Sequence, residues 1–510
     1  MKLVRLLAPM AVTVAACATG SAKSAPNAAE SATAGAGGAA PMQIVSRAQL
    51  RHEIDSMVAQ HQFRNAHFGV LVVDPEKGDT LYSLNAGKLF MPASNMKIVT
   101  GATALAQLGA DYTYRTSFEA AGTMKRDTLE GALIVTGRGD PTISDHMRGD
   151  AMNPLYDIAD SLRAHGIVAI TDGIRAGPDV FPDTTIGFGW SWDDLGEDYG
   201  AGIDALYFNE GFGTLIAHGK PGMAPDSFVT APSRKYPFVL DMTKGASPDT
   251  GDLRLDFNSL RNAFILRGRL KTSTDTLIYV YPSLRGAYVA ALTEALRSRG
   301  IAVGTGRWGT SNTDALPYDP AKMRALFTVR SLPLREILSA LEKPSQNQIA
   351  EILYKTLGLE KTGIGSADSG RAVVERQLAS WGVPADGYLI RDGSGLSRFD
   401  YLSPETIVRV LDKIRADTAF HVFYDALPIA GVDGSLEHRM RGTAAVGKIH
   451  AKTGSVANAR SLSGYAITAD NHTVIFSLLA NNWIVKQSAV DSVQNRIAVM
   501  LASLKLRDAH

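Results

Sequence analysis

The chain has 510 residues, of which 45% are hydrophobic and 20% charged, an ordinary globular composition with room for about three domains of ~150 residues. Its 52 Lys and Arg almost balance its 51 Asp and Glu, which leaves a formal charge of +1. This balance gives no sign of a nucleic-acid surface or a polybasic membrane patch, so no nucleic-acid partner is expected and bulk charge does not select the substrate.

Residues 1–17 have the plan of a secretory signal: a short basic start, an apolar run over 6–16 and small residues before Cys17. The run is too short to span a bilayer as a mature helix. Residues 14–17 resemble a bacterial lipobox, in which the cysteine is acylated and becomes the new N-terminus. Cys17 is the sole cysteine, so the chain has no disulfide, and its position favours a periplasmic lipoprotein anchored to the membrane. The alternative is ordinary cleavage after Ala18, which would give a soluble periplasmic protein.

Residues 18–42 are mostly Ala, Gly, Ser and Thr, a composition that predicts a flexible tether. The segment that follows has helical spacing over 46–60, then an apolar strand over 68–74, a turn and a second strand over 80–84. A helical pattern then runs from residue 95 to Gly109 and places Ser94 at the N-terminus of a helix.

The sequence pattern changes between residues 113 and 319, where short segments typical of strands, such as 131–135 and 277–281, alternate with Gly, Asp and Pro. Helical patterns return after this region at 334–341, 348–357, 406–414 and 489–504, with strands at 448–452, 462–468 and 474–479. The sequence therefore predicts an α/β (α+β) domain formed by residues 43–112 and 320–510, interrupted by a large β-rich insert over 113–319.

A serine and a lysine three residues apart, Ser94 and Lys97, form the first candidate catalytic pair. A serine hydroxyl needs a neighbouring base, and a lysine can act as that base if its surroundings lower its pKa. Positions i and i+3 of a helix share a face, so the Lys97 amine can reach the Ser94 oxygen. Such a pattern also arises by chance in a chain of this length. Here it falls at a helix start, where amide dipoles favour a developing oxyanion.

The second candidate is Ser345-Gln346-Asn347, which opens the helix predicted at 348–357. Ser345 has two interpretations: a simple helix N-cap, or a proton relay to the leaving group. In the functional interpretation the amide of Asn347 holds the substrate backbone.

The third candidate is Lys452-Thr453-Gly454-Ser455, on the strand predicted from residue 448. A cation and hydroxyl groups on a strand can bind a carboxylate, and Gly454 allows close approach of the backbone. The Ser455 amide can complete an oxyanion hole with the amide of Ser94.

Several similar patterns are assigned structural roles. Residues 83–85 read as a strand end and turn, and 361–363 as a helix terminator. The segment 392–398 is predicted to be a loop near the site, and His450 is predicted to be a strand residue. The histidines form no cluster typical of a metal site, so neither a metal nor another cofactor is expected.

Together the three candidates form the Ser-x-x-Lys, Ser-x-Asn and Lys-Thr-Gly set of penicillin-binding proteins and class A β-lactamases. The first two serines are 251 positions apart, which leaves room for an insert that a compact β-lactamase lacks. The chain closely resembles the D-alanyl-D-alanine carboxypeptidase/endopeptidases of the class C low-molecular-mass penicillin-binding proteins. Further resemblance lies in residues 137–142, 189–194 with Tyr199, 392–398 and 427–436.

The resemblance implies a serine transpeptidase/β-lactamase-like fold, with Ser94 as the acylated nucleophile and Lys97 as its base. It implies that Ser345 and Asn347 form the second element, and that Lys452, Thr453 and Ser455 surround the terminal carboxylate of the substrate. Peptidoglycan stem peptides are the implied substrates, and β-lactams the implied covalent inhibitors. Related enzymes recognise the amino end of a diaminopimelate side chain through an aspartate and an aromatic residue of the insert. Asp194 and Tyr199 look like their counterparts, although the adjacent Asp193 also fits.

Two other functions remain as alternatives. A β-lactamase or esterase would share the acylation machinery, but the long insert and the lack of a recognisable deacylating glutamate loop disfavour it. A non-catalytic wall-binding lipoprotein would need neither Ser94 nor Lys97. The balance between carboxypeptidase and endopeptidase activity, and the oligomeric state, do not follow from the sequence.

Overall fold

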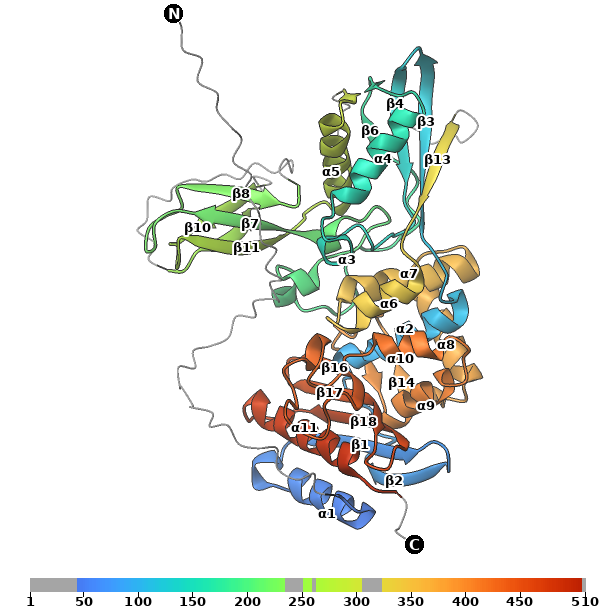
Figure 1. The fold of residues 1–510 in the computed structure, drawn as a ribbon, viewed down its shortest axis with the longest axis vertical. Helices are drawn as coiled ribbons and strands as arrows, with labels where there is room; N and C mark the ends of the chain where they lie inside the picture. Colours follow the sequence, from blue (N-terminus) through green and yellow to red (C-terminus); the bar gives the residue numbers. More distant parts are fainter. Residues whose placement is uncertain (1–43, 234–250, 259–262, 305–322, 507–510) are drawn as a thin grey trace, which may run out of the picture. The chain divides into compact units, whose positions relative to one another are not determined.

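The computed structural model describes residues 44–233, 251–258, 263–304 and 323–506 (Figure 1). The expected signal segment with Cys17, and the tether up to residue 42, lie outside the described residues. The expected boundary of the insert at residue 319 does so as well.

A five-stranded antiparallel sheet forms the centre of the domain that carries the three motifs. Its strand order is β16-β17-β18-β1-β2, so strands from the two ends of the chain pair side by side. The strands are β1 (His67–Asp74), β2 (Asp79–Leu84), β16 (Ile449–Val456), β17 (Ala459–Ile467) and β18 (Thr473–Asn481).

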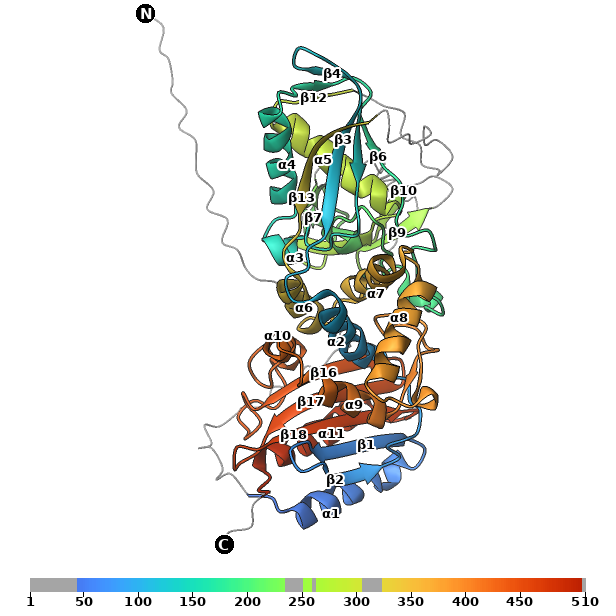
Figure 2. The same ribbon diagram turned by 90° about the vertical axis from the view of Figure 1, so that its right-hand side faces the viewer.

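Successive side chains of a strand point to opposite faces of a sheet, and the strands of this sheet carry apolar side chains on both faces. Helices therefore cover both faces. On β1, Val70 and Val72 pack in the cluster formed with α1 (Arg47–Val58) and α11 (Gln487–Ser503). Leu71, between them, faces the opposite cluster, to which α2 (Met96–Leu108) and α9 (Pro404–Ile414) contribute. Figures 1 and 2 show this arrangement of helices around the sheet.

Helix α2 follows the first motif, and the helices that lie around and after the second motif in sequence pack against it. Their bounds are α2 (Met96–Leu108), α6 (Leu334–Glu342), α7 (Asn347–Thr362), α8 (Ala367–Ser380), α9 (Pro404–Ile414) and α10 (Phe420–Ala426). Two short strands, β14 (Tyr388–Leu389) and β15 (Tyr401–Leu402), pair beside them. The elements expected from the sequence in this domain are confirmed, with ends that differ by a few residues.

The insert contains a mixed sheet and smaller β elements. The mixed sheet has the order β12-β5-β4-β3-β13, with β6 also paired to β4, and a second sheet has the order β11-β7-β8. The strands are β3 (Arg115–Lys125), β4 (Thr128–Thr136), β5 (Ala169–Ile170), β6 (Ile174–Ala176), β7 (Phe212–His218), β8 (Ser227–Ala231), β9 (Arg254–Asn258), β10 (Ala263–Arg267), β11 (Thr274–Val280), β12 (Ala302–Val303) and β13 (Arg324–Arg330).

Two features of the insert differ from the sequence expectation. It is not only β-rich, because helices α4 (Asn153–Ala164) and α5 (Leu284–Ser298) pack against each other, and a short α3 (Asp145–Arg148) precedes them. Strand β13 pairs with β3, so the insert sheet continues to Arg330, beyond the boundary expected at residue 319. Main-chain pairing across more than two hundred residues carries no local signal in the sequence.

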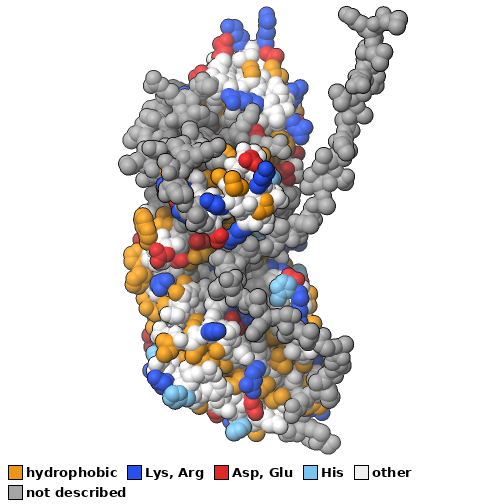
Figure 3. Space-filling view, turned by 90° about the vertical axis from the view of Figure 1, so that its left-hand side faces the viewer, with side chains coloured by type: hydrophobic (Ala, Val, Ile, Leu, Met, Phe, Trp, Pro, Cys, Tyr) orange, Lys and Arg blue, Asp and Glu red, His pale blue; other side chains and the backbone are white. Residues whose placement is uncertain are grey.

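The described surface carries charges of both signs. On the face drawn in Figure 3, basic and acidic side chains occur near one another, in keeping with the balanced composition. No helix within residues 44–233, 251–258, 263–304 and 323–506 combines the length and the apolar character that a membrane span requires.

Candidate active site

Ser94 lies in a single helical turn (Ala93–Asn95) that leads directly into α2, as the sequence predicts. The residue before it, Ala93, has a φ of 47°, a left-handed conformation that costs free energy for a residue with a side chain. Tertiary contacts hold this turn in place: the Asn95 side chain donates to the carbonyl of Lys452 over 2.9 Å, and Ser461 Oγ donates to the carbonyl of Pro92 over 2.7 Å. The first and third motifs are thus joined directly.

The Lys97 side chain is completely buried and lies 2.9 Å from Ser94 Oγ. Its Nζ also contacts Asn347 Oδ1 over 2.6 Å and the backbone carbonyl of Ser394 over 2.9 Å. Burial, and then the nearby charge of Lys452, lower the pKa of Lys97 to about 7. A substantial fraction of this amine is therefore neutral at neutral pH, as a general base requires.

Ser345 and Asn347 belong to the turn between α6 and α7. Ser345 is half-buried and has a φ of 70°. The interpretation of Ser345 as a helix N-cap is wrong, because the cap of α7 is Gln346, whose side-chain oxygen accepts from the Ile349 amide over 3.0 Å. The left-handed backbone at Ser345 keeps its side chain out of the capping position. Asn347 is the first residue of α7, and its side chain is hydrogen-bonded to Lys97.

Lys452 is fully buried on β16, and its Nζ donates to the carbonyl of Thr453 over 3.1 Å. Burial lowers the pKa of Lys452, and the charge of Glu342 acts against that shift. The hydroxyl of the next residue, Thr453, is 2.6 Å from that of Ser435, which lies in the turn Gly434–Leu436.

Gly454 brings β16 against the nucleophile turn. A Cβ built at Gly454 would lie 3.0 Å from the Ser94 amide nitrogen and 2.8 Å from the Pro92 carbonyl, and it would collide with Ser461 Oγ. Only glycine allows this approach of two main chains. The side chain of the next residue, Ser455, is exposed.

Asp194 and Tyr199 are brought to this site by the insert. They lie in two short turns, Trp192–Asp194 and Asp198–Gly200, and the Tyr199 hydroxyl donates to Asp194 Oδ1 over 3.0 Å. The Asn347 side-chain nitrogen donates to the Tyr199 carbonyl over 2.8 Å. Gln348 Nε2 donates to the carbonyl of Asp198 over 2.8 Å. The start of α7 therefore holds both the lysine and the insert.

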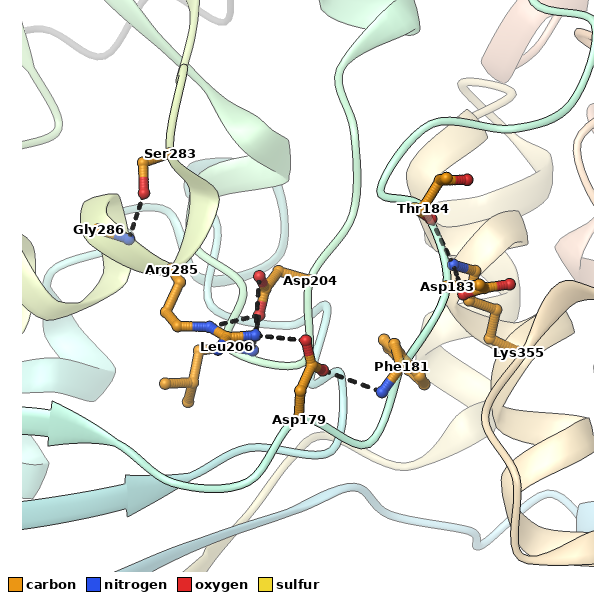
Figure 4. Close-up of polar contacts among 10 residues, drawn as sticks. All are labelled: Asp179, Phe181, Asp183, Thr184, Asp204, Leu206, Ser283, Arg285, Gly286 and Lys355. Atoms are coloured by element: carbon orange, nitrogen blue, oxygen red, sulfur yellow. Dashed lines mark hydrogen bonds and ion pairs between the residues drawn. The ribbon is translucent and has the colours of Figure 1, made fainter. Parts of the chain in front are cut away.

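We call residues 179–206 of the insert the bridging segment, because both domains anchor it (Figure 4). On one side Lys355 of α7 pairs with Asp183 and donates to the carbonyl of Thr184 over 2.7 Å. On the other side Arg285 of α5 pairs with Asp179 over 2.6 Å and Asp204 over 3.1 Å. These ion pairs fix the two ends of the bridging segment around Asp194 and Tyr199.

The segment 392–398, predicted to be a loop near the site, supplies further groups. Asp392 is buried and accepts from the Trp190 indole over 2.9 Å and from the amides of Gly395 and Ser397 over 2.6 and 2.7 Å. This confirms that 392–398 is a loop near the site.

Sequence reasoning missed three other groups. The Ser394 carbonyl acts as an acceptor through the main chain, and residue type does not predict such a role. Glu342 and Ser435 lie near the two lysine motifs only after folding.

The patterns given structural roles are found in those roles. Gly363, with a φ of 80°, ends α7, and Asn85 follows β2 and donates to the carbonyl of Phe68 over 2.9 Å. His450 lies on β16 with its ring stacked on Tyr424 at 4.1 Å between centroids. Within the described ranges no group of three or more His, Cys, Asp or Glu side chains is placed to hold a metal ion.

Comparison with known proteins identifies the family of the chain. The model of the D-Ala-D-Ala carboxypeptidase 3 (S13) family matches residues 50–504. A D-alanyl-D-alanine carboxypeptidase of Actinomadura sp. (strain R39) is 31% identical over 477 residues, which cover 89% of this chain and 84% of the relative. The D-alanyl-D-alanine carboxypeptidase DacB of Haemophilus influenzae is 25% identical over 441 residues, covering 82% of this chain and 86% of the relative.

A solved structure supports the fold. The crystal structure of penicillin binding protein 4 (dacB) from Haemophilus influenzae superposes with a TM-score of 0.70 at 21% identity and covers 87% of this chain and 98% of that one. The domain with its insert is therefore the fold of that structure. With a family match over residues 50–504 and a carboxypeptidase relative that is 31% identical, the chain belongs to the D-Ala-D-Ala carboxypeptidase 3 (S13) family and is a serine-type D-Ala-D-Ala carboxypeptidase.

Proposed function

We propose that the protein cleaves D-alanyl bonds of peptidoglycan stem peptides through an acyl-enzyme on Ser94, in both carboxypeptidase and endopeptidase reactions. The observation that carries this proposal is the environment of Lys97. Its amine is buried, has a pKa lowered to about 7, and lies 2.9 Å from the Ser94 oxygen.

The contacts of Lys97 orient its lone pair. A neutral amine has two N–H donors, and the Asn347 oxygen and the Ser394 carbonyl accept them. The lone pair then points to the remaining neighbour, the Ser94 hydroxyl. Lys97 takes the Ser94 proton as the oxygen attacks the D-alanyl carbonyl, and the breaking C–N bond leaves an amine that must gain a proton. Ser345 is the residue we assign to the relay of that proton.

The oxyanion of the tetrahedral intermediate is assigned to the amides of Ser94 and Ser455. The close approach at Gly454 supports this, since it places β16 beside the Ser94 amide. Lys452 and Thr453, on the same strand, are assigned to the terminal carboxylate of the substrate. Water then hydrolyses the ester to release the acid and restore Ser94. Removal of a terminal D-alanine and cleavage of a cross-link differ only in the leaving amine.

The bridging segment is assigned to recognition of the stem peptide. Asp194 is held by the Tyr199 hydroxyl, and the Tyr199 carbonyl is held by Asn347. A carboxylate in this place suits the free ammonium of a diaminopimelate side chain. The adjacent Asp193 is exposed. The contact between Tyr199 and Asp194 favours Asp194 for the role.

β-Lactams are proposed as covalent inhibitors, because they present an acyl group and a carboxylate to the same groups. The Haemophilus influenzae protein has been solved in complex with a β-lactam, in a structure with a TM-score of 0.69 to this chain.

A periplasmic location with a lipid anchor on Cys17 is also proposed. It rests on the lipobox-like sequence of residues 14–17 and on Cys17 being the sole cysteine. The tether of residues 18–42 would then join the anchor to the enzyme.

The test is to incubate the enzyme that starts at residue 43 with cross-linked and uncross-linked muropeptides and to weigh the products. Loss of one D-alanine from uncross-linked peptides and separation of cross-linked dimers are expected, with Ser94→Ala inactive in both reactions. Intact muropeptides with rapid turnover of β-lactams would instead assign a β-lactamase-type hydrolase. Binding to cell walls without any cleavage would assign a wall-binding protein.

A further inference from the structure

Glu342, the last residue of α6, is a fully buried acid that the mechanism above does not use. Neither of its carboxyl oxygens has a hydrogen-bond partner among the described residues. It also lies at the C-terminal end of a helix, where the helix dipole disfavours negative charge. An ionised carboxylate in such a place is strongly destabilising unless nearby positive charge compensates it.

The compensating charges are those of the active site. Two charged groups act on Glu342: Lys97 of α2, a helix that packs on α6, and Lys452 of β16. Burial raises the pKa of Glu342 and both lysines lower it. Among the described residues, α7 and α10 also pack on α6 but supply no charge that acts on this carboxyl.

Space for the carboxyl is provided by a glycine on the face of α2 that carries Lys97. Gly101 follows Lys97 by one helical turn, and a Cβ built there would lie 2.8 Å from Glu342 Oε1. The same Cβ would be at ordinary contact distances, 3.4 and 3.5 Å, from Leu338 and Leu341. The carboxyl therefore occupies the volume that a side chain at position 101 would fill.

Two other acids act on Lys97 but differ from Glu342. Asp392 and Glu351 also raise the pKa of Lys97, and both accept hydrogen bonds from backbone amides. Neither of these two acids acts on the pKa of Lys452, whereas the charge of Glu342 raises it. Glu342 is thus the acid that acts on both lysines, and among the residues described it makes no hydrogen bond that would take either lysine from its other contacts.

We propose that Glu342 is a positioning residue whose carboxylate is the buried counter-ion of both active-site lysines, and that it determines the pH range in which the enzyme acylates. The inference rests on the roles proposed above for Lys97 and Lys452. With Lys97 neutral, Lys452 protonated and Glu342 ionised, the charges of these three groups sum to zero. Transfer of the Ser94 proton to Lys97 then leaves one net positive charge opposite the developing oxyanion.

The sign of the effect follows from the lysines. The Glu342 carboxylate raises the pKa of both, so its removal lowers both. Acylation requires Lys97 to be neutral and Lys452 to be protonated. Both limbs of the pH profile therefore move to lower pH without Glu342. The alkaline limb moves further, because Glu342 itself takes up a proton at lower pH and its effect is already weakened there.

The experiment compares Glu342→Gln with wild type in the second-order rate constant for acylation by a fluorescent penicillin, from about pH 5 to about pH 10. The alkaline limb is expected to shift down by about one pH unit or more, a loss of roughly tenfold in rate at the alkaline end. Glu342→Asp, which keeps the charge, is expected to restore most of the wild-type profile. Glu336→Gln, at an exposed position of the same helix, is the matched control and is expected to leave the profile unchanged.

A second variant moves the carboxyl without removing it. Gly101→Ala is expected to shift the limbs in the same direction but less, and it answers the question if Glu342→Gln does not fold. A folded Glu342→Gln with a wild-type profile, or a Gln variant that changes only the melting temperature, would overturn the inference. A failure of the proposed lysine roles looks different, because Lys97→Met would then acylate normally in the presence of Glu342.

Discussion

The side-chain nitrogen of Asn347 donates a hydrogen bond to the backbone carbonyl of Tyr199 over 2.8 Å. The oxygen of the same amide lies 2.6 Å from Lys97 Nζ. One side chain thus connects the bridging segment of the insert to the catalytic base. The proposed recognition of the stem peptide and the proposed activation of the nucleophile therefore share a common support at the start of α7.

Ser94→Ala is expected to abolish covalent labelling by fluorescent penicillin while leaving the fold intact, because the acyl bond forms at the oxygen that is removed. Labelling is followed by gel fluorescence, and folding by circular dichroism. A folded alanine variant that still becomes labelled would place the nucleophile elsewhere.

Lys97→Met is expected to lower the acylation rate by ~10²–10⁴, the range typical for loss of a general base. The wild-type rate should also fall as pH drops through the lysine pKa of about 7, since protonation removes the lone pair. Below that pKa each pH unit costs about tenfold in rate. The check is the acylation rate constant of both proteins across this range. Near-normal acylation by the methionine variant would show that another group accepts the proton.

Gly454→Ala is expected to lower acylation by at least about 10²-fold, the scale of a lost oxyanion donor. The added Cβ would push β16 away from the Ser94 amide and the Pro92 carbonyl. Gly87→Ala is the matched control, because a Cβ there meets Glu405 only at ordinary distances of 3.6 Å or more. An active Gly454 variant would mean that the oxyanion is bound without β16.

Asp194→Asn is expected to weaken turnover of diaminopimelate-containing peptides and to leave a simple acyl-D-Ala-D-Ala substrate almost unchanged. The lost charge-assisted contact is worth ~1.5–3 kcal/mol, or roughly tenfold to a hundredfold in kcat/KM. Asp193→Asn is the control for the neighbouring carboxylate. Equal losses on both substrates would give Asp194 a structural role, and a selective loss in the Asp193 variant would move the recognition by one residue.

Cys17→Ala is expected to move the protein from the membrane fraction to the soluble periplasmic fraction, since stable anchoring takes acyl chains on that cysteine. Fractionation and the mass of the mature N-terminus provide the measurement. A mature N-terminus at Thr19 would replace the lipid anchor with ordinary signal cleavage.

Local patterns in the sequence were sufficient for the elements that carry the site. The helix after Ser94 and the strand through Lys452 follow from spacing and turn residues alone, and both are confirmed. The N-cap interpretation of Ser345 failed because capping depends on backbone angles: Ser345 has a φ of 70°, and Gln346 caps the helix instead.

The groups that sequence reasoning missed act across long separations or through the main chain. The Ser394 carbonyl accepts from Lys97 across 297 positions, and any residue type could supply it. In the sequence, Glu342 is an ordinary residue of a predicted helix, and its place beside α2 follows only from the packing of α6 on that helix. The effect of a buried charge depends on neighbouring groups that are brought close to it only in the folded chain.

The insert begins and ends on adjacent strands, with Arg115 of β3 paired directly with Arg330 of β13. Just inside the host domain, the Leu334 amide bonds to the Tyr112 carbonyl over 2.9 Å, which holds the two crossing chains together. The two ends of the insert therefore leave the host domain side by side, and the whole insert is a single closed loop on that domain. Because the entropy of closing a loop grows only with the logarithm of its length, such a junction lets the insert grow or shrink at small thermodynamic cost to the host. A change in the size of the insert can then alter substrate range while the serine-lysine chemistry stays in place.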